Sequence, residues 1–339
     1  MLFSAARGTG RGRKLERGGR SDMAAVKGRF APTPSGNMHL GNALCYLLVW
    51  LSARSQAGGV VLRFEDTDLL RMLPGAVEQT FSDLLWLGLD WDEGPSPADR
   101  DGPWFQSCRT EIYDRFFDAL CARGAVYPCF CSRRDVRLAA APHAEDRAAV
   151  YPGVCRELTP AEAAERMKRK APAWRLRLED ETVSFRDLLR GELSCEILRA
   201  YGDFPIRRAD GVYCYQFTAA LDDALMGVSE VLRSRDLLSS APWQVYLQRL
   251  LGFTPPVFVH IPMLLDEEGR RMAKRDSPLS VKELRRCYAP EEVLGRLAFL
   301  AGLQDAPEPR TAAQLVPLFS PEKLPKEDIL LPRGLFARR

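Results

Sequence analysis

Residues 29–42 read RFAPTPSGNMHLGN, and this stretch decides the fold expected for the whole chain. A short apolar segment leads into it, its prolines and glycines force a tight loop, and an apolar run over 40–51 follows. This order of strand, loop and helix places Met38, His39 and Gly41 at a helix N-terminus. Unpaired N–H groups and the helix dipole favour phosphate there, although an isolated histidine in this position is more commonly a helix cap.

A second short stretch, RMAKR at 271–275, supplies positive charge far downstream. Together the two stretches resemble the two signatures of class I aminoacyl-tRNA synthetases, in the form found in the glutamyl group. Asn42 stands at the degenerate last position of the first signature. In the second, Lys274 occupies the more important lysine position, whereas Arg271 replaces the first lysine and Ala273 replaces the serine.

The resemblance implies that ATP binds at both signatures, with Mg²⁺ bound to its phosphates. It assigns ATP binding to Met38, His39, Gly41, Asn42 and Lys274. Adenylation requires the α-phosphorus to be held in line with a carboxylate while charge on the leaving pyrophosphate is neutralised. We therefore expect His39 and Lys274 to be the catalytic residues.

Composition is typical of a globular enzyme and excludes two classes of protein. Of the 339 residues, 46% are hydrophobic and 27% are charged, and the net charge of +3 permits nucleic-acid binding without requiring it. No apolar run approaches the ~18 residues that span a membrane. Nine cysteines in so long a chain do not resemble a secreted disulfide framework, so we expect a cytoplasmic location.

Residues 1–27 differ from the rest, being rich in arginine and glycine and without periodicity. We expect a disordered basic extension, with Met23 as an alternative start. An arm that contacts RNA and an organelle-targeting segment stay open as alternatives.

The acidic run that begins at Glu65 follows a β-rich segment over 59–64. Ligands of parallel α/β sheets gather at the carboxyl ends of the strands, so one of these carboxylates could hold an ammonium group. A solvated turn with a helix cap is the alternative. Resemblance to glutamyl-tRNA synthetases implies that Glu65 binds the α-amino group of the amino acid.

The rest of the amino-acid pocket is also implied by the resemblance. Residues 212–217 alternate in polarity and predict a strand. Tyr215 and Arg233 stand at positions that hold the carboxylates of the substrate, and an arginine offers a planar bidentate fork for this task. A dicarboxylic amino acid needs two anion sites and one cation site. The glutamate-binding residues expected are Arg29, Ala31, Thr33, Glu65, Tyr215 and Arg233.

A group of cysteines predicts a structural zinc site. Cys129, Cys131 and Cys155 can converge on one Zn²⁺, which takes four N, S or O ligands in a tetrahedron. His143 and Tyr151 compete for the fourth position, and chemistry alone favours the imidazole. Three buried cysteines without a metal are the alternative.

The short form and the cysteine pattern together resemble the glutamyl-Q tRNA(Asp) synthetase family, over about residues 28–300. That family carries a Cys-x-Cys…Tyr-x-x-x-Cys zinc site, which implies Tyr151 rather than His143 as the fourth ligand. The fold implied is α/β, a Rossmann-type catalytic domain over 28–275 interrupted by a zinc-bearing insertion over 108–198. Residues 276–339 are expected to form a short helical region with no anticodon-binding domain.

The function implied is activation of L-glutamate by ATP and transfer of the glutamate to the queuosine base in the anticodon of tRNA(Asp). We expect a monomer whose partners are ATP, L-glutamate and queuosine-bearing tRNA(Asp), with no membrane contact. A truncated glutamyl-tRNA synthetase that charges a tRNA 3′ end stays open. So does a degraded paralogue that binds RNA without activating an amino acid, because Arg271 and Ala273 depart from the second signature.

Overall fold

The computed structural model describes residues 25–132, 134–135, 150–272 and 279–337. Most of the predicted basic extension lies outside these ranges, as do His143, Ala273 and Lys274. Lys27, the last residue assigned to that extension, begins the first strand. No helix in the described part of the chain is both long and apolar enough to cross a membrane.

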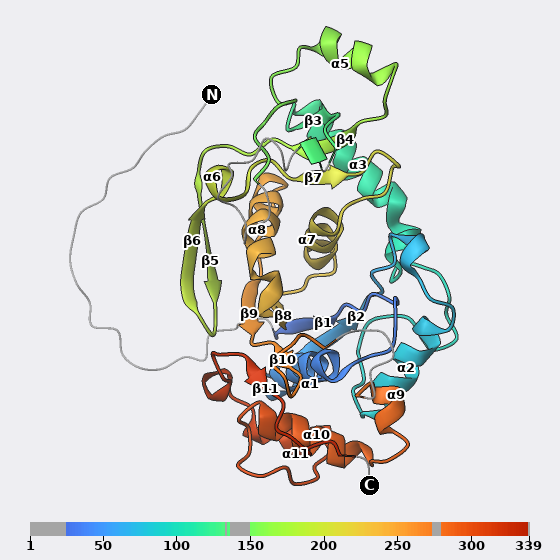
Figure 1. The fold of residues 1–339 in the computed structure, drawn as a ribbon, viewed down its shortest axis with the longest axis vertical. Helices are drawn as coiled ribbons and strands as arrows, with labels where there is room; N and C mark the ends of the chain where they lie inside the picture. The colour runs from blue at the N-terminus through green and yellow to red at the C-terminus, as the bar shows by residue number, and fades with distance from the viewer. Residues whose placement is uncertain (1–24, 133, 136–149, 273–278, 338–339) are drawn as a thin grey trace, which may run out of the picture.

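Parallel strands form the centre of the molecule (Figure 1). They pair as β1 (Lys27–Phe30) with β2 (Gly59–Leu62), and as β8 (Glu230–Ser234) with β9 (Val257–Ile261). The two pairs meet where β1 lies beside β8, because the Ser229 N–H donates to the Lys27 carbonyl oxygen over 3.0 Å. Each of these strands is largely buried, which is typical of a parallel sheet covered by helices.

Helix α1 (Leu40–Ser55) follows the RFAPTPSGNMHLGN loop and packs on β1, β2 and β8. Its residues are buried on nearly all sides, because the C-terminal helices α10 (Pro290–Leu300) and α11 (Ala312–Leu315) cover its other face. The strand, loop and helix predicted from residues 26–51 are therefore present, and they lie in the main hydrophobic core.

Strands from the segment predicted as an insertion join two sheets. Strands β3 (Val126–Cys129), β4 (Ala173–Leu176) and β7 (Pro205–Arg207) form an antiparallel sheet. The hairpin of β5 (Thr182–Asp187) and β6 (Gly191–Glu196) continues the catalytic sheet instead, in the order β6-β5-β9-β8. Part of the 108–198 segment therefore packs against the strand that follows β8.

The strand predicted over 212–217 is wrong. Only the bridge between Tyr213 and Arg207 is extended, and helix α7 (Tyr215–Leu225) begins two residues later. Alternating polarity is ambiguous over so few residues, and here burial of consecutive residues from Phe217 to Asp223 selects the helix.

The C-terminal region contains the helices α10 and α11, and it also contributes a strand. Strand β11 (Ile329–Leu330) pairs in parallel with β10 (Leu264–Leu265), which precedes the RMAKR stretch. Further α-helices are α2 (Ala76–Trp86), α3 (Thr110–Ala122), α5 (Pro160–Met167), α6 (Ile197–Tyr201), α8 (Ala241–Leu250) and α9 (Val281–Leu284).

Candidate active site and cysteine cluster

A cleft of about 490 Å³ opens at the carboxyl ends of the parallel strands. Its walls come from the loop after β1, the start of α1, and the ends of β8 and β9. Every predicted glutamate- or ATP-binding residue that the structure describes lines this cleft. These residues are Arg29, Ala31, Thr33, Met38, His39, Gly41, Asn42, Glu65, Tyr215 and Arg233.

His39 is the N-cap of α1, and its Nδ1 accepts the Asn42 N–H over 3.3 Å. The capping and ligand-binding interpretations are therefore compatible, since the ring lies at the helix terminus and also lines the cleft. The ring packs closely on Gly41, because a Cβ there would lie 3.1 Å from two of its atoms and would press on the imidazole. The start of α9 holds the backbone of Met38, because the Met38 carbonyl oxygen accepts the Val281 N–H over 2.8 Å.

Arg233, at the end of β8, is 3% exposed although its side chain lines the cleft. Its Nη1 donates to Gln244 Oε1 over 2.8 Å and lies 3.5 Å from the Tyr215 hydroxyl. Its Nη2 is buried and has no hydrogen-bond partner among the described residues. Burial lowers the pKa of Arg233, so an anionic ligand would stabilise the charged form.

Arg29 occupies the equivalent place at the end of β1. Its Nη1 donates to the Leu232 carbonyl oxygen over 2.9 Å, and its Nε lies 3.5 Å from an oxygen of Asp223. The two guanidiniums of Arg29 and Arg233 thus line one cleft from neighbouring strands. Such a pair suits a ligand with more than one anionic group.

Glu65 adds a carboxylate to the wall of the same cleft. Its Oε1 accepts from Arg63 Nη2 over 3.2 Å, and the side chain lines the cleft. Burial raises the pKa of Glu65, although Arg63 and Arg29 oppose the shift. A cationic group bound in the cleft would therefore favour the ionised carboxylate.

Sequence reasoning missed a buried charge network behind these residues. Arg63 is fully buried and forms ion pairs with Asp223 over 2.8 Å and with Asp222 over 3.9 Å. Asp222 also accepts from Arg109 over 2.8 Å. These partners are separated by more than 100 residues along the chain, so no local pattern could have revealed the network.

Two further polar groups complete the wall near the second signature. Arg271 lines the cleft, and its Nη2 lies 3.6 Å from Asp236. The thiol of Cys45 also lines the cleft, where burial raises its pKa to about 11. Lys274 lies outside the described residues, so its predicted role stays a prediction.

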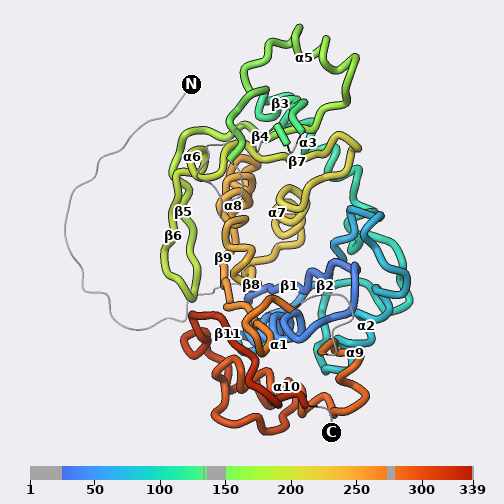
Figure 2. Tube along the Cα trace, viewed as in Figure 1, coloured from blue at the N-terminus to red at the C-terminus, as the bar shows by residue number. Residues whose placement is uncertain are grey.

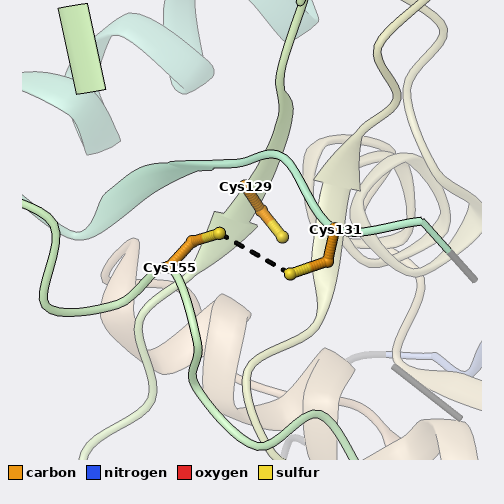
Figure 3. Close-up of side chains that lie close together, drawn as sticks. All are labelled: Cys129, Cys131 and Cys155. Atoms are coloured by element: carbon orange, nitrogen blue, oxygen red, sulfur yellow. Dashed lines mark hydrogen bonds between the residues drawn. The ribbon is translucent and has the colours of Figure 1, made fainter. Parts of the chain in front are cut away.

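The three predicted thiols converge at the end of β3 (Figure 3). The Sγ atoms of Cys129, Cys131 and Cys155 all lie within 4.8 Å of one another, and those of Cys131 and Cys155 are 3.6 Å apart. Figures 1 and 2 place β3 at the opposite end of the molecule from α10. The cysteine cluster is therefore distinct from the cleft.

Tyr151 lies beside the cluster and is 5% exposed. Its hydroxyl oxygen accepts the Cys155 N–H over 2.8 Å and lies 3.5 Å from Cys129 Sγ. Arg175 donates from Nε to Cys129 Sγ over 3.3 Å. Its Cζ lies 3.7 Å from the centroid of the Tyr151 ring, so the guanidinium stacks on that ring. Burial alone would raise the pKa of Cys129, but the contacts with Tyr151 and Arg175 lower it below its ordinary value.

Comparison with known proteins matches the catalytic-domain family of class I tRNA synthetases (E and Q) over residues 25–313. A glutamyl-Q tRNA(Asp) synthetase of Symbiobacterium thermophilum is 47% identical over 91% of this chain and 97% of its own length. One from Nitratidesulfovibrio vulgaris is 45% identical, over 92% and 98% of the two chains.

A solved structure is also similar. A glutamate tRNA ligase from Elizabethkingia meningosepticum, in complex with its amino acid, superimposes with a TM-score of 0.78 at 25% identity. The match covers 92% of this chain and 68% of that one. Sequence and fold agree that the chain belongs to the class I aminoacyl-tRNA synthetases, and within them to the glutamyl-Q tRNA(Asp) synthetase family.

Proposed function

We propose that this protein activates L-glutamate with ATP and transfers it to the queuosine base in the anticodon of tRNA(Asp). One observation carries the proposal: a single cleft joins two guanidiniums, a tyrosine hydroxyl and a buried carboxylate to a helix N-terminus. These are the complements of a dicarboxylic amino acid and a polyphosphate. The names of the similar synthetases support the choice of substrates.

For glutamate, the proposal assigns the carboxylates to Arg29, Arg233 and Tyr215. Glu65 receives the α-ammonium group, and the loop residues Ala31 and Thr33 contact the substrate from the β1 side. The free Nη2 of Arg233 supports this assignment, because a buried donor without a partner is costly until a ligand accepts from it.

For ATP, the proposal assigns the start of α1 and the second signature. The backbone around Met38, Gly41 and Asn42 would approach the nucleotide, while His39 and Lys274 stabilise charge on the phosphates. Mg²⁺ bound with ATP would supply further neutralisation of the phosphate charge.

The reaction proposed has two balanced steps. A carboxylate oxygen of glutamate attacks the α-phosphorus of ATP and pyrophosphate leaves, which gives glutamyl-adenylate. A hydroxyl of the queuosine cyclopentene ring then attacks the activated carbonyl, loses its proton and displaces AMP. The protein contributes position and electrostatic stabilisation rather than a covalent intermediate.

We further propose a structural zinc site formed by Cys129, Cys131, Tyr151 and Cys155. The donors fit: three sulfur atoms lie within 4.8 Å of one another and the phenol oxygen lies 3.5 Å from one of them. Zinc would draw these ligands into a tetrahedron and stabilise the loop between β3 and α5. Arg175 would balance the negative charge of the thiolates.

Mapping of the product tests the function. Purified protein is incubated with ATP, labelled glutamate and tRNA(Asp), either carrying or lacking queuosine, and the labelled tRNA is digested with nuclease. We expect label on the queuosine nucleotide only. Label on the 3′-terminal adenosine, or equal charging of tRNA without queuosine, would instead identify a truncated glutamyl-tRNA synthetase. Absence of glutamate-dependent ATP–pyrophosphate exchange would identify a degraded RNA-binding paralogue.

A further inference from the structure

A buried histidine and aspartate lie directly behind Arg233. Arg233 Nε donates to Nε2 of His260 over 3.0 Å, and His260 Nδ1 lies 2.6 Å from Asp187 Oδ2. All three side chains are at most 3% exposed. Arg233 comes from β8, His260 from β9 and Asp187 from β5, three adjacent strands of one sheet.

The proton positions in this series of hydrogen bonds follow from which atoms can donate and which can accept. An arginine Nε can only donate, so Nε2 of His260 must accept and its proton must be on Nδ1. That Nδ1–H donates to Asp187, which fixes the tautomer. Burial lowers the pKa of His260, although Asp187 opposes the shift, and the imidazole is therefore neutral.

Asp187 is itself rigidly held. Its Oδ1 accepts the N–H groups of Leu189 and Arg190 over 3.0 Å each, in the turn between β5 and β6. Its Oδ2 also accepts the His260 backbone N–H over 3.1 Å. These hydrogen bonds lower the pKa of Asp187 despite burial, so the carboxylate stays ionised.

The His260 imidazole lies between the Asp187 carboxylate and the Arg233 guanidinium, so the two charged groups are not in direct contact. A carboxylate in direct contact would form a bidentate pair with the guanidinium and occupy its fork. Here the rear contacts use Nε and Nη1, while Nη2 has no partner within the described ranges. The guanidinium is thus charged and fixed in plane, yet one of its nitrogen atoms is available.

We propose that Asp187 and His260 are positioning residues for substrate recognition, which hold Arg233 so that it selects an amino acid with an anionic side chain over its neutral amide. This inference rests on the proposed function and takes the side-chain carboxylate of glutamate as the group that Arg233 binds. Neither residue contacts the substrate in this proposal. They act through Arg233, whose orientation and charge decide between glutamate and glutamine.

Two substitutions of similar length test the role of the imidazole. His260→Gln keeps an acceptor near the Nε2 position, whereas His260→Met removes it. We expect His260→Met to raise the KM for glutamate in ATP–pyrophosphate exchange by about tenfold or more, the loss typical of a buried hydrogen bond to a charged group. The KM for ATP should stay within about twofold. The preference for glutamate over glutamine in kcat/KM should fall, and His260→Gln should restore part of both losses.

Val259→Ala is the matched control. Val259 adjoins His260 on β9 and is also buried, but its side chain packs into the main hydrophobic core. It should lower the Tm without changing the KM for glutamate. The inference is wrong if His260→Met leaves glutamate KM and selectivity unchanged, or if Val259→Ala alters them equally. Calorimetric titration of each variant with glutamate gives an independent reading. A wild-type protein that binds glutamate without catalysing exchange would contradict the proposed function alone, and one that binds no glutamate would contradict both.

Discussion

The charged residues behind the cleft are buried, as are Cys129 and Cys155 of the cysteine cluster, whereas Cys131 is half-buried. Different contacts hold the two groups in place. Behind the cleft, Arg63 and Asp222 are fixed by ion pairs and hydrogen bonds to several elements of the fold. In the cluster, the Sγ atoms of Cys131 and Cys155 lie 3.6 Å apart, and Cys155 Sγ also accepts the Phe130 N–H over 3.4 Å. The first site is organised by the protein itself, whereas the second has the donor set of a metal centre.

This difference indicates that the two sites are stabilised in different ways, one by contacts within the protein and the other by a bound ion. A network of fixed charges positions the substrate groups before any ligand arrives, which is the preorganisation that electrostatic catalysis needs. A structural metal site gains its folding free energy from the ion. The two sites should therefore fail independently, and substitutions at each can test that.

The largest effect is expected at the cluster. Cys131→Ser should abolish binding of about one zinc per chain and expose the segment around β3 to hydrogen exchange, since structural zinc contributes folding free energy directly. Elemental analysis and exchange measurements check this. Cys195→Ser, which changes a thiol on β6 outside the cluster, should retain the metal, and the KM for glutamate should change in neither variant.

The fourth ligand is tested in the same assay. Loss of zinc after Tyr151→Phe with retention after His143→Ala would support phenolate ligation, and the reverse result would assign the imidazole. Absence of zinc from the purified native protein would contradict the proposed metal site.

The next largest effect is expected in the network behind the cleft. Asp222→Asn removes the countercharge of Arg109 and the weaker of the two aspartate partners of Arg63. Breaking a buried pair such as Arg109–Asp222 costs about 3–5 kcal/mol. Chemical denaturation should show this loss while zinc content is unchanged. Asp90→Asn is the control, because its ion pair with Arg54 is exposed and should contribute at most about 1 kcal/mol. Equal losses in both variants would contradict the role assigned to the network.

A smaller effect is expected from a substitution in the second signature, which should impair the proposed ATP-binding part of the cleft and leave the glutamate-binding part intact. Lys274→Ala should lower the adenylation rate by roughly 10²-fold, as expected for loss of a charge that stabilises the transition state. Glutamate affinity should change little, because the proposed glutamate residues lie on β1, β8, the start of α7 and the segments that follow β1 and β2. Exchange activity within a few-fold of the wild type would show that the second signature does not act as proposed.

The smallest effect concerns pH. Burial raises the pKa of Glu65 in the folded protein, so the folded state holds this proton more tightly than the unfolded state. Stability from this group is fully present below the unfolded pKa of 4.5 and is lost as the pH rises through the folded pKa. Glu65→Gln should therefore raise the Tm slightly at neutral pH, by about 1–3 °C, and the difference should vanish in acid. The same variant should lose glutamate binding.

Local sequence was sufficient for the elements that carry the cleft. The loop before α1 combines prolines and a glycine with an N-cap histidine, and the described residues matched to the family line one cleft. The strand predicted over 212–217 was wrong because six residues do not distinguish the two periodicities, and burial around Phe217 decided for the helix. Asp187 and His260 could not have been predicted, because sheet pairing alone joins them to Arg233.

The short pairing of β10 with β11 has a consequence for synthesis of the protein on the ribosome. The strand that leads into the second signature meets its partner only after residue 330 has been made. At 5–20 residues per second, the chain between these strands takes about 3–13 s to synthesise. Helix α1 and the loop before it also pack on residues made late, namely Val281, α10 and α11. Competence to bind ATP at both signatures therefore arrives late in translation.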